Sequence, residues 1–352
     1  TVMAYHLLLQ LTAVFAVWKQ NPAEGAEKRS SRKLKAYLKG NIETGMGAKV
    51  GITNNSLSSE FGENLSEDLS QLPRVLAAEM TAPARSFCDD PEHGYEVVFK
   101  DEFDEFDYGH WTKTIGKQHV GELRDAFGLH KNVDIEHGQL RIRAWREKIV
   151  RDGFVFPNVD FTSGSISTKR KHSWSNGRIC IRSFLPGAKN RSTGIWPAYW
   201  LLPETQQCWP DQGEIDIMEM INGNGRVMGS YHWNPEFPKQ RCTGHTKRTF
   251  KSRHINVPTW DKDWNEYAIE WDGKSYIKYY INGVLYNVVR GSNKNERGPD
   301  EAYFSGQPMY LMLGTAIASK HTAGLAQPVS DNTIFPNYHY IDHVIVSQRK
   351  QS

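Results

Sequence analysis

The stretch Gly213–Met220, GEIDIMEM, places three carboxylates in a segment whose other residues are typical of a buried β-strand. Glu214, Asp216 and Glu219 alternate with isoleucine and methionine, the residues a strand directs into a core. A buried carboxylate costs several kcal/mol unless it is paired or used. The segment therefore predicts a strand with one face in the core and the other face committed to chemistry.

The spacing of these acids predicts a β-bulge. In a regular strand Glu214 and Asp216 point to one face, and Glu219 points to the other. One extra residue in a bulge returns Glu219 to the first face, and bulges are common beside active sites. The glutamate Cα atoms then lie roughly 13 Å apart, at about 3.3 Å for each of four steps. On a concave strand the carboxyl groups close to about 5 Å, the separation that a retaining glycosidase requires.

Two interpretations of the acidic pattern stand side by side. In the first, one ionised glutamate attacks an anomeric carbon and the other, protonated, donates to the leaving oxygen. Neighbouring carboxylates push their pKa values apart, and Asp216 between them tunes the nucleophile. In the second, the segment is an ordinary surface strand with outward charges, because short acidic motifs recur by chance.

The chain from Cys88 onward has the texture of an all-β protein. Short runs of β-branched and aromatic residues are separated by Gly, Asn, Asp and Pro, and several alternate with a period of two. These runs are YEVVF, QLRIRAW, GRICIRSF, NEYAIEW, YIKYYING and YIDHVIV. They predict an antiparallel β-sandwich of the jelly-roll type, with its concave inner face available as a substrate cleft.

Three regions are expected along the chain. Residues 1–18 resemble a signal peptide, because the apolar run is too short to cross a bilayer comfortably and ends in small residues. An uncleaved anchor is the alternative. Residues 19–85 are polar and nearly free of aromatic residues, which predicts a flexible linker or propeptide. Residues 86–352 are expected to form the catalytic domain.

Composition narrows the partners and the compartment. Lys and Arg total 43 against 40 Asp and Glu, and a net charge of +3 gives no argument for nucleic acid or an anionic membrane. Aromatic residues make up 12% of the chain, which suits either sugar stacking or a β-rich core. Four cysteines, with three possible pairings, favour an oxidising compartment. We expect a secreted protein without stable membrane insertion after signal cleavage.

The residues around the acidic strand carry a family resemblance. Gly194–Pro203, GIWPAYWLLP, precede CWPDQGEIDIMEM, and the chain also contains NVDIEHGQLRIRAW, YHW and AIEWDG. In this combination the sequence resembles glycoside hydrolase family 16, specifically its laminarinase-like β-glucanases. The resemblance extends over residues 95–348.

The resemblance implies roles for the carboxylates. Glu214 corresponds to the nucleophile, Glu219 to the general acid/base and Asp216 to the assisting acid. The implied activity is retaining, endo-acting hydrolysis of β-1,3-glucan such as laminarin, extending to mixed β-1,3-1,4-glucan. This double displacement by two glutamates needs no catalytic metal or other cofactor.

The resemblance also implies substrate-binding residues. His232 corresponds to a histidine beside the catalytic carboxylates, and Trp200 and Trp209 correspond to tryptophans that form sugar platforms. Trp196 shares the strand face of Trp200, and it either joins these platforms or packs in the core.

Asp342 matches a position where many family members hold a structural calcium ion, with a surface salt bridge as the alternative. One cysteine pairing would join Cys208 to Cys242 beside the motif strand and leave Cys88 with Cys180, although the connectivity stays open.

Two departures from the family pattern leave the linkage preference open. Ser165 stands where many laminarinases have an arginine, and the segment LGTAIAS replaces an Asn-containing strand and a Gly-Gly loop. Transglycosylation is a further outcome of the same intermediate. The alternative functions are a non-catalytic β-glucan recognition protein and a hydrolase of a related algal galactan.

Overall fold

The computed structural model describes residues 85–117, 126–151, 154–155, 159–205, 208–238, 242, 249–294, 301–318 and 326–350. The chain divides into two units, Thr1–Thr81 and Ala82–Ser352, and the described residues all belong to the second. The expected signal peptide (1–18) lies outside the described residues, as does the expected linker (19–85) apart from Arg85. The expected start of the catalytic domain at residue 86 stays a prediction.

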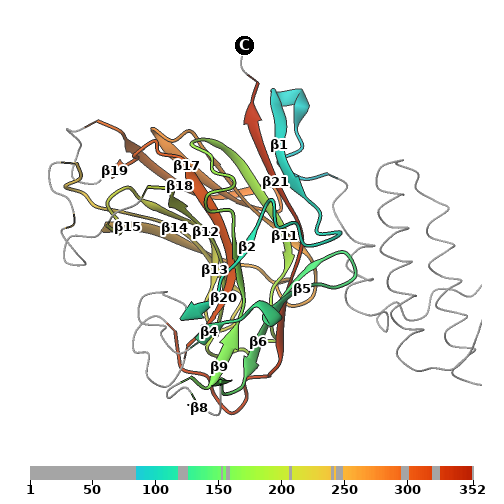
Figure 1. Ribbon diagram of the computed structural model, residues 1–352. Coiled ribbons are helices and arrows are strands. Elements are labelled where there is room, and N and C mark those ends of the chain that lie inside the picture. The colour runs from blue at the N-terminus through green and yellow to red at the C-terminus, as the bar shows by residue number, and fades with distance from the viewer. Residues whose placement is uncertain are drawn as a thin grey trace, which may run out of the picture. The chain divides into compact units, whose positions relative to one another are not determined.

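Two large β-sheets form the second unit (Figure 1). Within the described residues, one sheet has 12 strands and the other has 7. The pairs are antiparallel except for two short parallel pairs, β4 with β9 and β18 with β19. Both sheets contribute to one apolar core cluster. The fold is therefore the all-β sandwich that the sequence predicts.

The larger sheet runs in the order β19 (Ala302–Tyr303), β18 (Val284–Ser292), β17 (Tyr276–Ile281), β16 (Asn265–Trp271), β11 (Gly177–Phe184), β21 (Asn337–Arg349), β6 (Leu140–Arg146), β9 (Phe161–Ser163), β4 (Ala126–Gly128) and β3 (Gly116–Lys117), with β1 (Tyr95–Asp101) paired to β21 and β5 (Val133–Ile135) paired to β6. The smaller sheet runs in the order β15 (Thr249–Asn256), β14 (Arg226–Trp233), β13 (Glu214–Met220), β12 (Ile195–Pro203), β20 (Met309–Ile317), β10 (Ser165–Ser167) and β2 (Thr112–Lys113). The hairpin strands β7 (Val150–Arg151) and β8 (Phe154–Val155) and the 3-10 helices η2 (Pro91–His93) and η3 (His130–Asn132) complete the described elements.

The core lies between the two sheets and is built by alternation along the strands. On β12, Tyr199 and Leu201 are fully buried in the main core cluster, whereas the intervening Trp200 is half-buried on the other face. On the larger sheet, Ile179 and Ile181 of β11 belong to the same cluster. Each such side chain contributes about 1.5–3 kcal/mol by burial, so the inward faces fix how the sheets pack. The outward face of the smaller sheet remains for polar groups, and we call it the site face.

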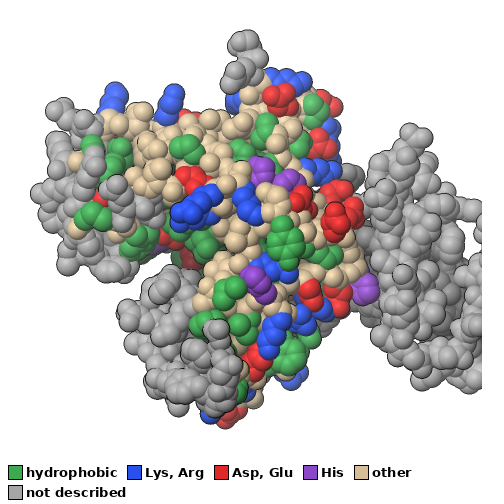
Figure 2. Space-filling model, viewed as in Figure 1, with side chains coloured by type: hydrophobic (Ala, Val, Ile, Leu, Met, Phe, Trp, Pro, Cys, Tyr) green, Lys and Arg blue, Asp and Glu red, His purple; other side chains and the backbone are tan. Residues whose placement is uncertain are grey.

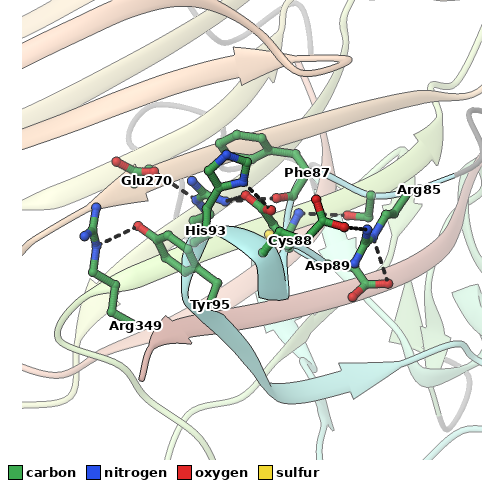
Figure 3. Close-up of polar contacts among 12 residues, drawn as sticks. Arg85, Phe87, Cys88, Asp89, His93, Tyr95, Glu270 and Arg349 are labelled. Atoms are coloured by element: carbon green, nitrogen blue, oxygen red, sulfur yellow. Dashed lines mark hydrogen bonds and ion pairs between the residues drawn. The ribbon is translucent and has the colours of Figure 1, made fainter. Parts of the chain in front are cut away.

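The N-terminal segment of the described chain is fastened to the larger sheet (Figure 3). A disulfide joins Cys88 to Cys180 of β11. The Arg178 guanidinium binds Asp90 and Glu270 at 2.9 Å each and lies 3.7 Å from the centre of the Tyr95 ring. A disulfide and a largely buried ion-pair network therefore hold this segment. Among the described residues no helix has the length and apolar character needed to span a bilayer.

A histidine links the two sheets inside the core. His339 of β21 is fully buried, with Tyr199 of β12 at its Nε2 and Thr315 of β20 at 3.1 Å from its Nδ1. Burial lowers the pKa of His339 to about 3, because the core penalises the charged ring. This histidine therefore stays neutral in the folded protein at ordinary pH.

The buried histidine predicts a specific loss of stability in acid. The unfolded chain takes up a proton on this residue below its ordinary pKa of 6.5, whereas the folded chain does so only near pH 3. Stability therefore falls as the pH drops from about 6.5 toward 3, by up to about 1.4 kcal/mol per pH unit. We expect the melting temperature of His339→Gln, whose side chain cannot be protonated, to fall less between pH 7 and pH 4.5 than that of the wild type. Equal losses in calorimetry would contradict this account.

Candidate active site

Strand β13 contains the bulge that the sequence predicts. Glu214 and Asp216 pair with His232 and Ser230 of β14, but Glu219 pairs with Met228, so Ile217 and Met218 together oppose Gly229. Both of these apolar side chains lie in the core cluster. The extra residue therefore lets β13 bury its apolar side chains while Glu214, Asp216 and Glu219 all face outward.

Ser230 connects two of the three carboxylates. Its hydroxyl is fully buried and lies 2.6 Å from Asp216 Oδ2 and 3.4 Å from Glu219 Oε2. A hydroxyl donates one proton, and the shorter contact is to Asp216. Asp216 therefore accepts the main hydrogen bond, and the same oxygen lies 3.2 Å from Nε2 of His232.

Each glutamate receives an indole N–H from a different tryptophan. Trp196 Nε1 donates to Glu219 Oε1 at 3.1 Å, and Trp209 Nε1 donates to Glu214 Oε2. Trp196 is only 6% exposed and packs in a small apolar cluster with Ala316. Its ring therefore offers little surface to a sugar, and what it supplies to the site is the hydrogen bond that orients Glu219.

Burial and mutual repulsion govern the charges of this group. Burial raises the pKa of Glu214 well above its ordinary value, the charge of Asp216 raises it further, and the Trp209 donor opposes the shift. Burial and Asp216 likewise raise the pKa of Glu219, against donors from Trp196 and Ser230. The carboxyl groups of Glu214 and Glu219 therefore lose their protons at a higher pH than isolated carboxyl groups do.

Aromatic rings flank the carboxylates on the site face. His232 lies 5.7 Å from Trp209 and stacks on Phe250 of β15 at 5.3 Å, measured between ring centres. Phe250 is 56% exposed. Trp200, which pairs with Asp216 in the sheet, is half-buried on the same face. These rings border the acids on both sides along the direction that crosses the strands.

The two departures from the family pattern meet next to Glu219. Ser165 of β10 pairs with Gly314 of β20, Gly314 pairs with Ala198 of β12, and Ala198 pairs with Glu219. A Cβ atom at Gly314 would lie 2.8 Å from the Cβ of Ser165, so the strands allow no larger side chain there without a shift. The row beside Glu219 is therefore lined by small residues.

A disulfide joins Cys208 to Cys242 beside the motif strand, and with Cys88–Cys180 it uses all four cysteines of the chain. Of the three possible pairings, the structure has the one suggested by the positions of Cys208 and Cys242 beside the motif strand. The buried Asp211 accepts hydrogen bonds from the Asn234 side chain and the Cys242 backbone N–H, both at 2.9 Å. Although Cys208, Asp211 and Cys242 lie close together, the disulfide occupies both sulfurs, so they do not form a metal site.

Asp342 lies apart from this group, on β21. Its carboxylate is 2% exposed and binds Arg182 at 2.9 Å and the His343 ring at 3.0 Å. Calcium selects oxygen ligands, and these two partners are nitrogen donors. The contacts fit an ion pair rather than a calcium site, and the expected calcium ion stays a prediction without support from them.

Sequence reasoning named the three acids, His232, three tryptophans and Asp342. The structure brings all of these except Asp342 together at the site face. The sequence reasoning missed Ser230 and Phe250, which reach the site through the β13–β14 and β14–β15 pairings. The alternation of the GSYHW segment could have shown that Ser230 shares a face with His232.

Comparisons with known proteins identify the family of this chain. The family model Glycosyl hydrolases family 16 matches residues 125–329. A beta-glucanase of Rhodothermus marinus is 30% identical over 264 residues, covering 72% of this chain and 85% of that protein. A glucan endo-1,3-beta-glucosidase A1 of Niallia circulans is 26% identical, covering 95% of this chain and 47% of that protein.

The fold is similar to that of a solved laminarinase from Rhodothermus marinus, with a TM-score of 0.60 and 29% identity over 73% of this chain and 98% of that one. The chain belongs to glycosyl hydrolases family 16 and is a glycoside hydrolase.

The raised pKa of Glu219 predicts a stability cost at high pH. The unfolded chain loses this proton near the ordinary value of 4.5, whereas the folded chain holds it to higher pH. Stability is therefore full below about pH 4.5 and declines as the pH rises toward the folded-state pKa. We expect the melting temperature of Glu219→Gln relative to wild type to rise by several degrees between pH 5 and pH 8, at about 2–4 °C per kcal/mol.

The matched control for this measurement is Glu96→Gln, which changes an exposed glutamate of β1. Its melting temperature should follow that of the wild type at both pH values. A pH-independent difference for Glu219→Gln would show that the carboxyl group of Glu219 ionises normally.

Proposed function

We propose that this chain is a retaining, endo-acting hydrolase of β-1,3-glucan that also accepts mixed β-1,3-1,4-glucan. The observation that carries the proposal is the bulged β13, which sets two glutamates on one face with Asp216 between them. The printed names of the relatives, a glucan endo-1,3-beta-glucosidase and a laminarinase, support the β-1,3 linkage.

Different environments support different roles for the two glutamates. Glu219 is 9% exposed, whereas Glu214 is only half-buried and receives the Trp209 indole N–H. The deeper carboxyl group is the better one to hold a proton, and the more solvated one is easier to ionise. Glu219 is therefore the general acid/base and Glu214 the nucleophile. Asp216, held by Ser230 and His232, assists by modulating the charge on both glutamates.

The reaction then proceeds in two displacements. Glu214 attacks the anomeric carbon while Glu219 donates its proton to the glycosidic oxygen, so one sugar fragment leaves and a glycosyl ester forms on Glu214. Glu219, now ionised, removes a proton from water, and the water oxygen attacks the same carbon and releases Glu214. A sugar hydroxyl in place of water would give transglycosylation.

The substrate is proposed to cross the strands of the smaller sheet. Trp200, Asp216 and Ser230 form one row across β12, β13 and β14, and the next row carries His232 and Phe250. Aromatic rings offer apolar faces to sugars, and Nδ1 of His232 is buried without a hydrogen-bond partner in the described structure. Substrate is therefore proposed to contact Trp200, Trp209 and His232.

We also propose that the protein is secreted, because its two disulfides favour an oxidising compartment.

Product analysis tests the substrate. We expect the wild type to release short oligosaccharides from laminarin, with less from lichenan and none from agarose, while Glu214→Gln loses at least about 10³-fold in rate because the nucleophile is gone. Chromatography of the three digests is the measurement. Cleavage of agarose alone would replace the glucan with a galactan, and binding of laminarin without cleavage would indicate a recognition protein.

The two glutamates are separable by leaving group. A general acid matters little when the leaving group is already a good one, such as a nitrophenol, because no proton is needed to expel it. We expect Glu219→Gln to retain the glycosylation step on a nitrophenyl β-glucan oligoside far better than on laminarin. Glu214→Gln should lose activity on both substrates to the same extent. If Glu214→Gln retained activity on the nitrophenyl substrate and Glu219→Gln did not, the two roles would be exchanged.

A further inference from the structure

A strip of aromatic side chains lies on the larger sheet, on the face turned away from the core. On β6, Leu140, Ile142 and Ala144 are buried, whereas the alternating Arg141, Arg143 and Trp145 are half-buried on the opposite face. On the neighbouring β21, Tyr338 pairs with Arg143 and Tyr340 pairs with Arg141. We call Trp145, Tyr338 and Tyr340 the outer strip; it belongs to a different sheet from Glu214 and Glu219.

The outer strip is held in place by polar contacts. Arg141 binds Asp134 at 2.8 Å, and its guanidinium lies 5.6 Å from the Tyr338 ring centre. Arg143 binds Asp134 at 2.9 Å, and the Tyr340 hydroxyl donates to Glu136 at 3.1 Å. These contacts orient the Tyr338 and Tyr340 rings, so little conformational entropy would be lost when a ligand stacks on those two rings.

A pocket of about 520 Å³ lies at the Trp145 end of the strip. Trp145, Phe335 and Pro336 supply its apolar walls, and Arg146, Asp331 and Thr333 supply polar groups. The Arg146 guanidinium lies 5.4 Å from the ring centres of both Phe161 and Phe335. The pocket therefore combines an aromatic wall with hydrogen-bonding groups of both kinds.

Spacing and charge indicate what the strip would bind. Alternate residues of a strand lie about 6.6 Å apart, and the Tyr338 and Tyr340 rings are 6.1 Å apart. Rings repeated at this interval suit a ligand made of repeated apolar-faced units. Three arginines around the strip and pocket are matched by Asp134, Glu136 and Asp331, so the surface favours a neutral ligand over an anionic one. On the side of the molecule drawn in Figure 2, too, acidic and basic side chains are interleaved over the described part.

We propose that the outer strip and the adjoining pocket form a second, non-catalytic binding site for a neutral polysaccharide chain, which is the polymeric β-glucan substrate itself. The choice of ligand rests on the proposed function. Sugar rings stack on Trp145, Tyr338 and Tyr340, and sugar hydroxyls bind Arg146 and Asp331. Such a site raises the concentration of enzyme on polymer without touching the reacting bond, as multivalent binding does.

The test separates this site from the catalytic one by ligand length. Inactive Glu219→Gln protein is run in native gels containing laminarin, with a saturating short β-1,3-gluco-oligosaccharide that occupies the catalytic face. We expect laminarin to retard this protein even with the oligosaccharide present. Adding Trp145→Ala and Tyr338→Ala should weaken the affinity for laminarin about tenfold, as the loss of two stacked rings implies. Tyr338→Ala alone, which leaves the pocket intact, should show a smaller loss.

Two controls keep the result interpretable. Tyr108→Ala removes an aromatic ring that is 64% exposed elsewhere, and it should leave retardation unchanged. In the active enzyme, the Trp145→Ala/Tyr338→Ala pair should leave kcat/KM on a short soluble oligosaccharide within about twofold and lower the rate on insoluble glucan.

Undiminished retardation of the Trp145→Ala/Tyr338→Ala pair, or loss of all retardation once the short oligosaccharide is present, would overturn the second site. Laminarin cleavage by the wild type is measured separately, so that result leaves the proposed function standing. Retardation and cleavage with agarose in place of laminarin would overturn the glucan as ligand of both sites.

Discussion

The extra residue in β13 is the constraint on which the rest of the site depends. A regular strand could not bury Ile215, Ile217 and Met220 together and still present Glu214 and Glu219 to one face. The bulge places both Ile217 and Met218 in the core. Sandwich packing and carboxylate geometry are thus satisfied by the same local irregularity, and apolar burial fixes the position of the acids.

The same arrangement makes ionisation of the carboxyl groups at the proposed catalytic site unfavourable. Three acids share a poorly solvated face, so the pKa values of Glu214 and Glu219 rise, and the neighbouring Asp216 adds repulsion. Two indole N–H groups and the Ser230 hydroxyl offset part of this cost. A site tuned in this way sacrifices stability for carboxyl groups that hold their protons above the ordinary pKa of a glutamate, as functional sites commonly do.

Local sequence was enough for much of the fold and for the acids. Short runs of β-branched and aromatic residues, several with period-two alternation, predicted β1, β6, β11, β16, β17 and β21, and the odd spacing between Glu214 and Glu219 predicted the bulge. Ser230 and Phe250 were missed, because their contacts depend on which strands pair. The environment of Asp342 was equally hidden, since its partner Arg182 comes from β11. From the sequence, Trp196 could either pack in the core or form a sugar platform. Its hydrogen bond to Glu219 depends on the register between β12 and β13.

In the proposed mechanism, Glu214 attacks the sugar directly while Glu219 donates a proton to the leaving oxygen. The stereochemistry of the first product tests it. Proton NMR during the first minutes of laminarin hydrolysis, before mutarotation, reports the configuration of the new anomeric centre. Double displacement predicts the β-anomer first, with α appearing later. Immediate formation of the α-anomer would mean that water attacks directly across a wider gap of about 6.5–9.5 Å, which would contradict the account.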